Sequence, residues 1–147
     1  MLDLRGVWKS FGGQDVLRGV DLAVGQGEFV SFIGHSGCGK STLLNVVGGL
    51  LEADAGEVNL DGKVITGPGP DRAMVFQNYS LLPRLSLLAN VREAARAARP
   101  ERKGALNDEI VERYLRAVSL WEHKDQRPAQ VSGGMQQRTA VARAFAV

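Results

Sequence analysis

The stretch Gly34-His35-Ser36-Gly37-Cys38-Gly39-Lys40-Ser41-Thr42 decides the fold of this chain. It fits the phosphate-loop pattern G-x-x-x-x-G-K-[ST], in which two glycines, a lysine and a hydroxyl side chain must fall in register. Before it, residues 28–33 form an apolar run of β-branched and aromatic side chains, which predicts a buried strand. After it, apolar residues recur at helical spacing from Leu43 to Leu51. Strand, glycine-rich loop and helix are the setting that this motif requires.

The residue types of this loop indicate that it binds a nucleoside triphosphate. Glycines without a Cβ let backbone N–H groups approach an anion closely, at the positive end of the following helix. Lys40 would direct its charge at the β- and γ-phosphates, Ser41 would offer a hydroxyl ligand to Mg²⁺, and Thr42 would support an adjoining phosphate. The alternative is a glycine-rich turn with a solvated lysine. The predicted nucleotide-binding residues of the loop are Gly34, His35, Ser36, Gly37, Cys38, Gly39, Lys40, Ser41 and Thr42.

The composition fits about one domain with a core of its own, since 44% of the 147 residues are hydrophobic. With 18 basic and 16 acidic residues, the net charge of +2 predicts neither a nucleic-acid nor an acidic partner. The N-terminus lacks the order of a secretory signal, and no apolar stretch is long enough to span a membrane. Cys38 is the only cysteine, which excludes an internal disulfide and indicates a reducing compartment. It is either a small loop residue or a regulatory thiol.

The first half of the chain is predicted to mix strands with the loop and its helix. Alternating side chains indicate strands near residues 2–7 and over residues 16–24. Asp61-Gly62 predicts a two-residue hairpin turn within residues 56–65. A short apolar run predicts one further buried strand over residues 72–77.

The second half is predicted to be helical, because strand signals disappear from about Ala89 onward. One helix is expected over residues 91–99, where Pro100 stops it, and a second along an apolar stripe over residues 110–118. Arginines on one face of the first of these helices are read as a solvated face, with an acidic lipid or nucleic-acid contact as the alternative.

Ser132-Gly133-Gly134 is the third informative stretch. Ser132 is a good helix N-cap, a role that contributes about 1 kcal/mol. Two glycines in the first turn of a helix each cost up to about 1 kcal/mol relative to alanine, so capping alone does not explain them. A second anion close to this helix N-terminus would explain both the serine and the glycines.

In their order, these motifs resemble the ATP-binding subunit of ABC transporters. The phosphate loop is followed by Gln77 at the end of a short strand, and then by a helical insert ending in Ser-Gly-Gly. The resemblance extends from the first strand to Val147. It implies an α/β P-loop NTPase fold of the ABC type, C-terminally incomplete, with a nucleotide-binding core and antiparallel β portion over residues 1–88 and a helical subdomain over residues 89–147.

The resemblance also implies roles for single residues. Phe11 matches the aromatic residue that stacks on adenine, the alternative being a core phenylalanine beside a turn. Lys40 and Gln77 would serve catalysis, with Gln77 approaching Mg²⁺ and water and sensing the membrane subunit; the metal ligands would be Ser41 and Gln77. The family signature, which closes over the γ-phosphate held by the opposite subunit, would comprise Ser132, Gly133 and Gly134.

Finer features resemble the importers of nitrate, sulfonate, taurine and related anions. These features are Gly67-Pro68-Gly69-Pro70-Asp71-Arg72, Phe76-Gln77-Asn78, Leu81-Leu82-Pro83 and Met135 after the double glycine. Four positions depart from the family pattern, and none of them removes a phosphate ligand. They are Val131 for leucine, Ser119 for glycine, Arg84 for tryptophan and Thr139 for an apolar residue.

The resemblance implies ATP and Mg²⁺ as cofactors and a peripheral place on the cytoplasmic face of the cell membrane. The implied partners are transmembrane permease subunits, a second ATP-binding subunit and a solute-binding protein, with no nucleic acid. In the family an Asp-Glu strand and a histidine follow the signature helix, and these 147 residues contain neither. We therefore expect an N-terminal portion of an importer ATPase that does not turn over ATP alone. The alternatives are a non-transport ABC-type ATPase and a truncated nucleotide-binding protein without turnover.

Overall fold

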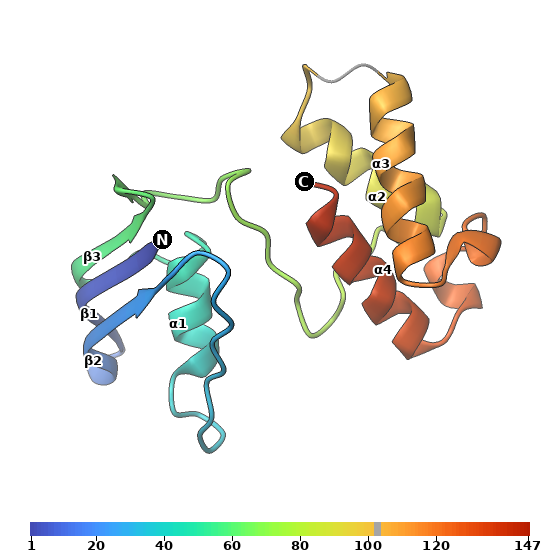
Figure 1. Ribbon diagram of the computed structural model, residues 1–147. Coiled ribbons are helices and arrows are strands. Elements are labelled where there is room, and N and C mark those ends of the chain that lie inside the picture. Colours follow the sequence, from blue (N-terminus) through green and yellow to red (C-terminus); the bar gives the residue numbers. More distant parts are fainter. Residues whose placement is uncertain (102–103) are drawn as a thin grey trace. The chain divides into compact units, whose positions relative to one another are not determined.

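The computed structural model describes residues 1–101 and 104–147, and the chain divides into two compact units (Figure 1). The first unit comprises Met1–Arg72 and the second comprises Ala73–Val147. The first contains a β-sheet with one helix, and the second is helical. The subdomain boundary predicted between residues 88 and 89 stays a prediction.

The first unit contains a four-stranded antiparallel sheet in the order β2-β1-β3-β4. Its strands are β1 (Leu2–Phe11), β2 (Gln14–Val24), β3 (Ala55–Leu60) and β4 (Lys63–Val64). The strands predicted near residues 2–7 and over residues 16–24 are thereby confirmed. The predicted hairpin turn is confirmed as well, because Asp61 and Gly62 both have positive φ angles, of 50° and 77°. A two-residue turn with positive φ at both positions matches the twist of the flanking strands.

Helix α1 (Lys40–Val47) packs on one face of this sheet. Leu43 and Val46 are its buried residues, and their spacing of three places both on the same side of the helix. They join apolar side chains from three strands in one core, and the buried members of this core are Leu4, Val7, Leu17, Leu43, Val46 and Val58. The phosphate-loop helix is therefore fixed to the sheet directly after the loop.

Two predicted strands are wrong. Residues 28–33 and 72–77 are not in strands, and Phe29 and Ile33 are 93% and 95% exposed. Val75 and Phe76 are exposed as well. A strand needs a neighbour to accept and donate its ladder hydrogen bonds, and no strand of the described residues pairs with either run. Apolar composition alone does not supply that partner.

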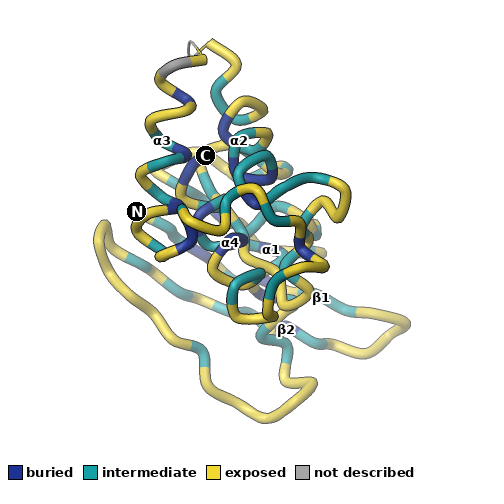
Figure 2. Tube along the Cα trace, turned by 90° about the vertical axis from the view of Figure 1, so that its right-hand side faces the viewer, coloured by how far each residue is buried: buried dark blue, intermediate teal, exposed yellow. Residues whose placement is uncertain are grey.

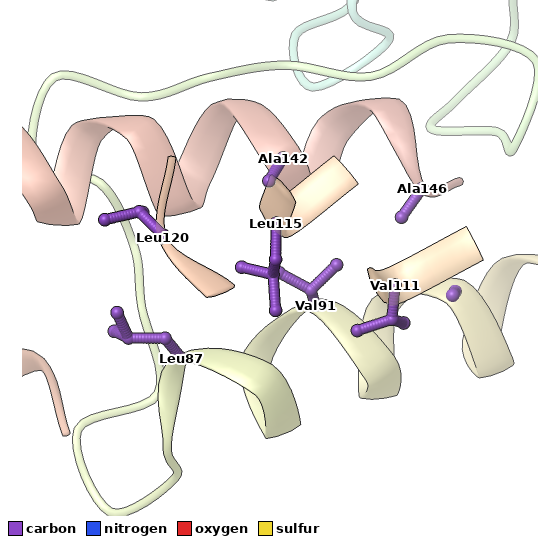
Figure 3. Packing of buried hydrophobic residues seen from close by; sticks show 8 residues of the cluster. Leu87, Val91, Val111, Leu115, Leu120, Ala142 and Ala146 are labelled. Atoms are coloured by element: carbon purple, nitrogen blue, oxygen red, sulfur yellow. The ribbon is translucent and has the colours of Figure 1, made fainter. Parts of the chain in front are cut away.

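The second unit is built on three helices, α2 (Leu87–Ala98), α3 (Gly104–Ala117) and α4 (Gly133–Phe145). Two short 3₁₀ turns, η1 (Trp121–His123) and η2 (Pro128–Gln130), connect α3 to α4. The helices bury a shared apolar core (Figure 3), and exposed residues cover their outer surfaces (Figure 2). The buried members of this core are Leu87, Val91, Ala95, Val111, Leu115, Leu120, Ala142 and Ala146.

The helix ends follow the local sequence. The Ser86 side chain caps α2 by accepting from the Ala89 N–H at 3.2 Å, and α2 ends before Pro100, as predicted. Beyond α3, Ser119 has a φ of +58°, the left-handed conformation that favours glycine at a helix C-terminus. Among the described residues, the helices are all too short or too polar to cross a membrane.

Candidate nucleotide-binding site

The loop before α1 curls around the ammonium group of its own lysine. Lys40 Nζ donates hydrogen bonds to the carbonyl oxygens of Gly34 and His35, both at 2.7 Å, and lies 3.4 Å from the Cys38 Sγ. These contacts hold one positive charge in the concave side of the loop. Cys38 is an exposed free thiol on that side, and an added Cβ on Gly34 would come within 2.7 Å of its sulfur.

Gly39 joins the loop to α1 in a conformation that other residues rarely adopt. Its φ is +96°, and an added Cβ would lie 3.1 Å from the Val16 carbonyl oxygen and 3.2 Å from the Leu17 Cδ2. Strand β2 therefore packs directly behind this point of the loop. Glycine is required here for both backbone conformation and space.

The N-terminus of α1 is suited to an anion. It has no side-chain cap and no acidic residue in its first turn. The first N–H groups of a helix lack intrahelical acceptors, and the helix dipole makes this end positive. Together with the Lys40 ammonium, these groups form a positive site without a negative side chain from the helix itself. This geometry fits the phosphates of a nucleotide.

An open depression of about 330 Å³ lies beside the loop. It has a mixed lining of β2, loop and helix residues, which includes Val16, Arg18, Ile33, Lys40 and Leu43. Phe11, at the end of β1, is 49% exposed and lies under the Lys9 ammonium, with 5.8 Å between Nζ and the ring centre. Phe11 is therefore not a buried core residue, and its stacking role stays a prediction.

The predicted metal ligands lie in different units. Ser41 is exposed in the first turn of α1, and Gln77 is exposed in the second unit. The described residues contain no group of three or more His, Cys, Asp or Glu side chains that could hold a metal ion. Mg²⁺ in nucleotide sites is usually held by one or two protein oxygens together with phosphates and water. The Ser41 hydroxyl fits that mode, and its role stays a prediction.

Ser132 caps α4 as predicted, because its Oγ accepts from the Met135 N–H at 3.3 Å. Ser132, Gly133 and Gly134 are all exposed. An added Cβ on Gly134 would meet nothing within 4 Å, and one on Gly133 would lie at 3.5 Å from the Tyr79 hydroxyl, an ordinary contact distance. Packing among the described residues therefore does not require either glycine. The expected approach of an outside group to this backbone stays a prediction.

Three structural features of the second unit were missed in the sequence. Arg143 of α4 donates to the carbonyl oxygens of Tyr79 and Ser80, more than sixty residues earlier. Thr139 is fully buried and satisfies its hydroxyl by donating to the Met135 carbonyl at 2.8 Å. Asn90 is also buried. Its Oδ1 accepts from the Leu82 N–H, and its Nδ2 donates to the Leu82 carbonyl oxygen. The contacts of Arg143 and Asn90 reach beyond one helical turn, so no local pattern signals them. The Thr139 bond lies within one turn of α4.

Comparison with known proteins gives consistent results. The family model "ABC transporter" matches residues 17–147. A nitrate import ATP-binding protein of Synechococcus elongatus is 51% identical over 131 residues, which are 89% of this chain and 48% of that protein. A bicarbonate transport ATP-binding protein of Synechocystis is 49% identical over 136 residues, covering 92% of this chain and 48% of that protein. The chain thus spans about half the length of these curated relatives.

Solved structures show the same fold. The dimeric structure of the bacterial ABC transporter cassette MJ0796 matches with a TM-score of 0.88 and 34% identity, covering 99% of this chain and 69% of that one. A second structure of that cassette, a post-hydrolysis state bound to ADP and phosphate, matches with a TM-score of 0.86 and the same coverage. The α/β cassette fold predicted from the motifs is therefore confirmed.

Proposed function

Because this chain belongs to the ABC transporter family, we propose that it is the ATP-binding part of an importer for a small anion. The observation that carries this proposal is the phosphate loop, whose carbonyls hold the Lys40 ammonium directly before the uncapped N-terminal turn of α1. Relatives named for nitrate import and bicarbonate transport support an anion as the solute. Sulfonate and taurine remain further candidates by resemblance.

In this proposal the chain's own residues bind and orient ATP. The N–H groups of residues 34–42 and the Lys40 ammonium hold the β- and γ-phosphates, and Ser41 offers its hydroxyl to Mg²⁺. Bound Mg²⁺ would supply charge neutralisation at the phosphate oxygens. Phe11 would stack on the adenine, and Gln77 would serve the metal and the attacking water.

Ser132, Gly133 and Gly134 are proposed to act on a second nucleotide, held by a partner subunit. Their exposure and the open space beside Gly134 support this role. The Ser132 Oγ accepts from the Met135 N–H, so the Ser132 O–H and the N–H groups of Gly133 and Gly134 are the donors left for a phosphate. One structural neighbour is a dimeric cassette bound to ADP and phosphate, which agrees with two such subunits acting together.

The proposed partners follow from the same family. They are a second ATP-binding subunit, the transmembrane permease subunits and a solute-binding protein, and the place is the cytoplasmic face of the membrane. No nucleic-acid partner is proposed, because the net charge of +2 leaves no general excess of basic residues.

Titration of a fluorescent ATP analogue with Mg²⁺ tests the binding role. We expect Lys40→Ala to weaken binding at least about tenfold, since it removes the one ammonium held inside the loop. Lys63→Ala is the matched control, because Lys63 is an exposed lysine on β4 of the same unit. Equal affinity of wild type and Lys40→Ala would refute the phosphate-loop assignment.

The same proteins test turnover. We expect the 147-residue polypeptide to release phosphate no faster than its Lys40→Ala variant, because catalysis also needs a group that polarises the attacking water, and the amide of Gln77 is too weak a base for that. Binding without turnover supports this view of the chain. Lys40-dependent phosphate release well above that control would show that its residues suffice for hydrolysis.

A further inference from the structure

Arg143 connects the end of α4 to the turn that follows Gln77. Its Nη1 donates to the Ser80 carbonyl oxygen at 2.5 Å, and its Nη2 donates to the Tyr79 carbonyl oxygen at 2.9 Å. A guanidinium that binds two acceptors at once fixes their relative position as well as their distance. The side chain is half-buried, and burial lowers the pKa of its guanidinium. Partial removal from water strengthens both bonds.

The turn held by Arg143 is in an unfavourable backbone conformation. Tyr79 and Ser80 have φ angles of +59° and +47°, and neither is glycine. Two consecutive left-handed residues persist only where surrounding contacts hold them. Within the turn, the Tyr79 N–H donates to the Phe76 carbonyl at 3.0 Å and the Ser80 N–H to the Asn78 carbonyl at 2.7 Å. Arg143 binds the carbonyls of the two left-handed residues themselves, Tyr79 and Ser80.

The turn also contacts the opposite end of α4. The Tyr79 hydroxyl lies 3.5 Å from the position that a Cβ on Gly133 would occupy. Gly133 and Arg143 are ten residues apart, about 15 Å along the helix. Tyr79 therefore lies beside both ends of α4: its carbonyl accepts from Arg143, and its hydroxyl borders the space that a Gly133 side chain would fill. A displacement of α4 along its axis would move Arg143 relative to the two carbonyls that it binds.

Gln77 lies inside this turn, between Phe76 and Asn78, and is in neither a helix nor a strand. We propose that Arg143 is a positioning residue that couples the turn 76–80, and Gln77 with it, to α4. A group bound at Ser132, Gly133 and Gly134 then shifts Gln77 through the helix. This inference rests on the proposed function, in which Gln77 and the Ser132–Gly134 stretch both act on nucleotide.

Amide hydrogen exchange on the whole 147-residue chain, resolved by NMR, tests the coupling. In Arg143→Gln we expect the Tyr79 and Ser80 amides to exchange about tenfold faster, since both carbonyl contacts are lost. Core amides of α2 and α3 should stay within about twofold of wild type, whereas a merely stabilising arginine would change them equally. Arg143→Lys, which keeps the charge but not the paired donors, should give a smaller acceleration.

Arg138→Gln is the matched control, because Arg138 lies on the same helix and donates to the Val118 carbonyl at 2.8 Å. It should leave the Tyr79 and Ser80 amides within about twofold of wild type. Unchanged exchange at these two amides in Arg143→Gln would overturn the proposal. So would an equal acceleration in Arg138→Gln.

A second perturbation at the far end of α4 tests the transmission itself. Ser132→Ala removes the helix cap and should accelerate Tyr79 and Ser80 exchange in the wild-type background. In the Arg143→Gln background it should add less than about twofold, because the connection is already broken. If the exchange rates of the double variant rise by the product of the two single accelerations, Ser132 and Arg143 act independently and the coupling is overturned.

If Arg143→Gln does not fold, amide exchange of the wild-type chain is measured in low concentrations of denaturant instead. Tyr79 and Ser80 amides that open together with the amides of α4 support the coupling, and opening independent of α4 overturns it. None of these measurements uses nucleotide. Equal ATP affinity of wild type and Lys40→Ala would therefore refute the proposed function while leaving the exchange result to stand. A failed exchange test would in turn refute the coupling while leaving the ATP-binding result to stand.

Discussion

Gly39→Ala should damage the phosphate loop more than any other single methyl addition within it. The wild-type φ of +96° is unfavourable for alanine by about 1–3 kcal/mol. The new Cβ would also press on the Val16 carbonyl oxygen at 3.1 Å and the Leu17 side chain at 3.2 Å, and such overpacking costs about 1–3 kcal/mol. Together these give about 2–6 kcal/mol against the observed loop conformation.

Gly37→Ala separates the two contributions. Gly37 has a φ of +81°, but an added Cβ there meets nothing within 4 Å. This variant should show only the conformational cost of about 1–3 kcal/mol, while Gly39→Ala should show the conformational and the packing cost. The difference between them measures how firmly β2 supports the loop.

The free-energy cost of each glycine substitution is the sum of its loss of folding stability and its loss of ATP-binding free energy. Urea unfolding gives the loss of stability, and titration with a fluorescent ATP analogue gives the loss of affinity, where about 1.4 kcal/mol corresponds to tenfold. We expect the sum to be larger for Gly39→Ala than for Gly37→Ala by at least about 1 kcal/mol. Equal sums for the two variants, or a Gly39→Ala protein with wild-type stability and affinity, would refute this reasoning.

Three further predictions concern residues outside the loop. Phe11→Ala should weaken ATP binding about fivefold or more while leaving inorganic triphosphate binding unchanged, because stacking acts on the base; titration with both ligands checks this. Ser119→Gly should raise the free energy of unfolding by about 0.5–1 kcal/mol, since its φ of +58° suits glycine, and urea unfolding that shows a loss instead would contradict it. A bond from the Lys9 ammonium, and one from the Ser10 N–H, lower the pKa of the Asp54 carboxyl. The contribution of Asp54 to stability is therefore complete above its unfolded pKa and is lost as the pH falls through its folded pKa. In Asp54→Asn the free energy of unfolding should therefore depend less on pH in that acidic range, which urea unfolding at several pH values checks.

Much of the fold could be predicted because its signals are local. Asp61-Gly62 determines its turn through its own backbone, and Ser132 caps a helix that starts at the next residue. Pro100 marks the end of α2 in the same way. In each case the responsible group and its effect lie within a few residues of one another, so the sequence shows both.

The errors and omissions have a common physical cause. Residues 28–33 have a strand-like composition, yet strand formation depends on a partner that composition does not reveal. The contacts of Arg143 with Tyr79 and Ser80 join a side chain to distant carbonyl groups, which every residue possesses. For the site, the motif predicted the lysine and glycines of the loop, whereas the support from Val16 behind Gly39 required the structure.

The exposed run over residues 28–33 affects how this polypeptide behaves in solution. Between residues 29 and 39 there is no Asp, Glu, Lys or Arg, so no charge interrupts the apolar sequence Phe-Val-Ser-Phe-Ile. An uncharged β-prone segment of this kind, free of proline and with Phe29 and Ile33 open to solvent, is a template for pairing with its copy on another molecule. Self-association should therefore rise with concentration, and solubility should be governed by these few residues more than by the charged surface of the helices.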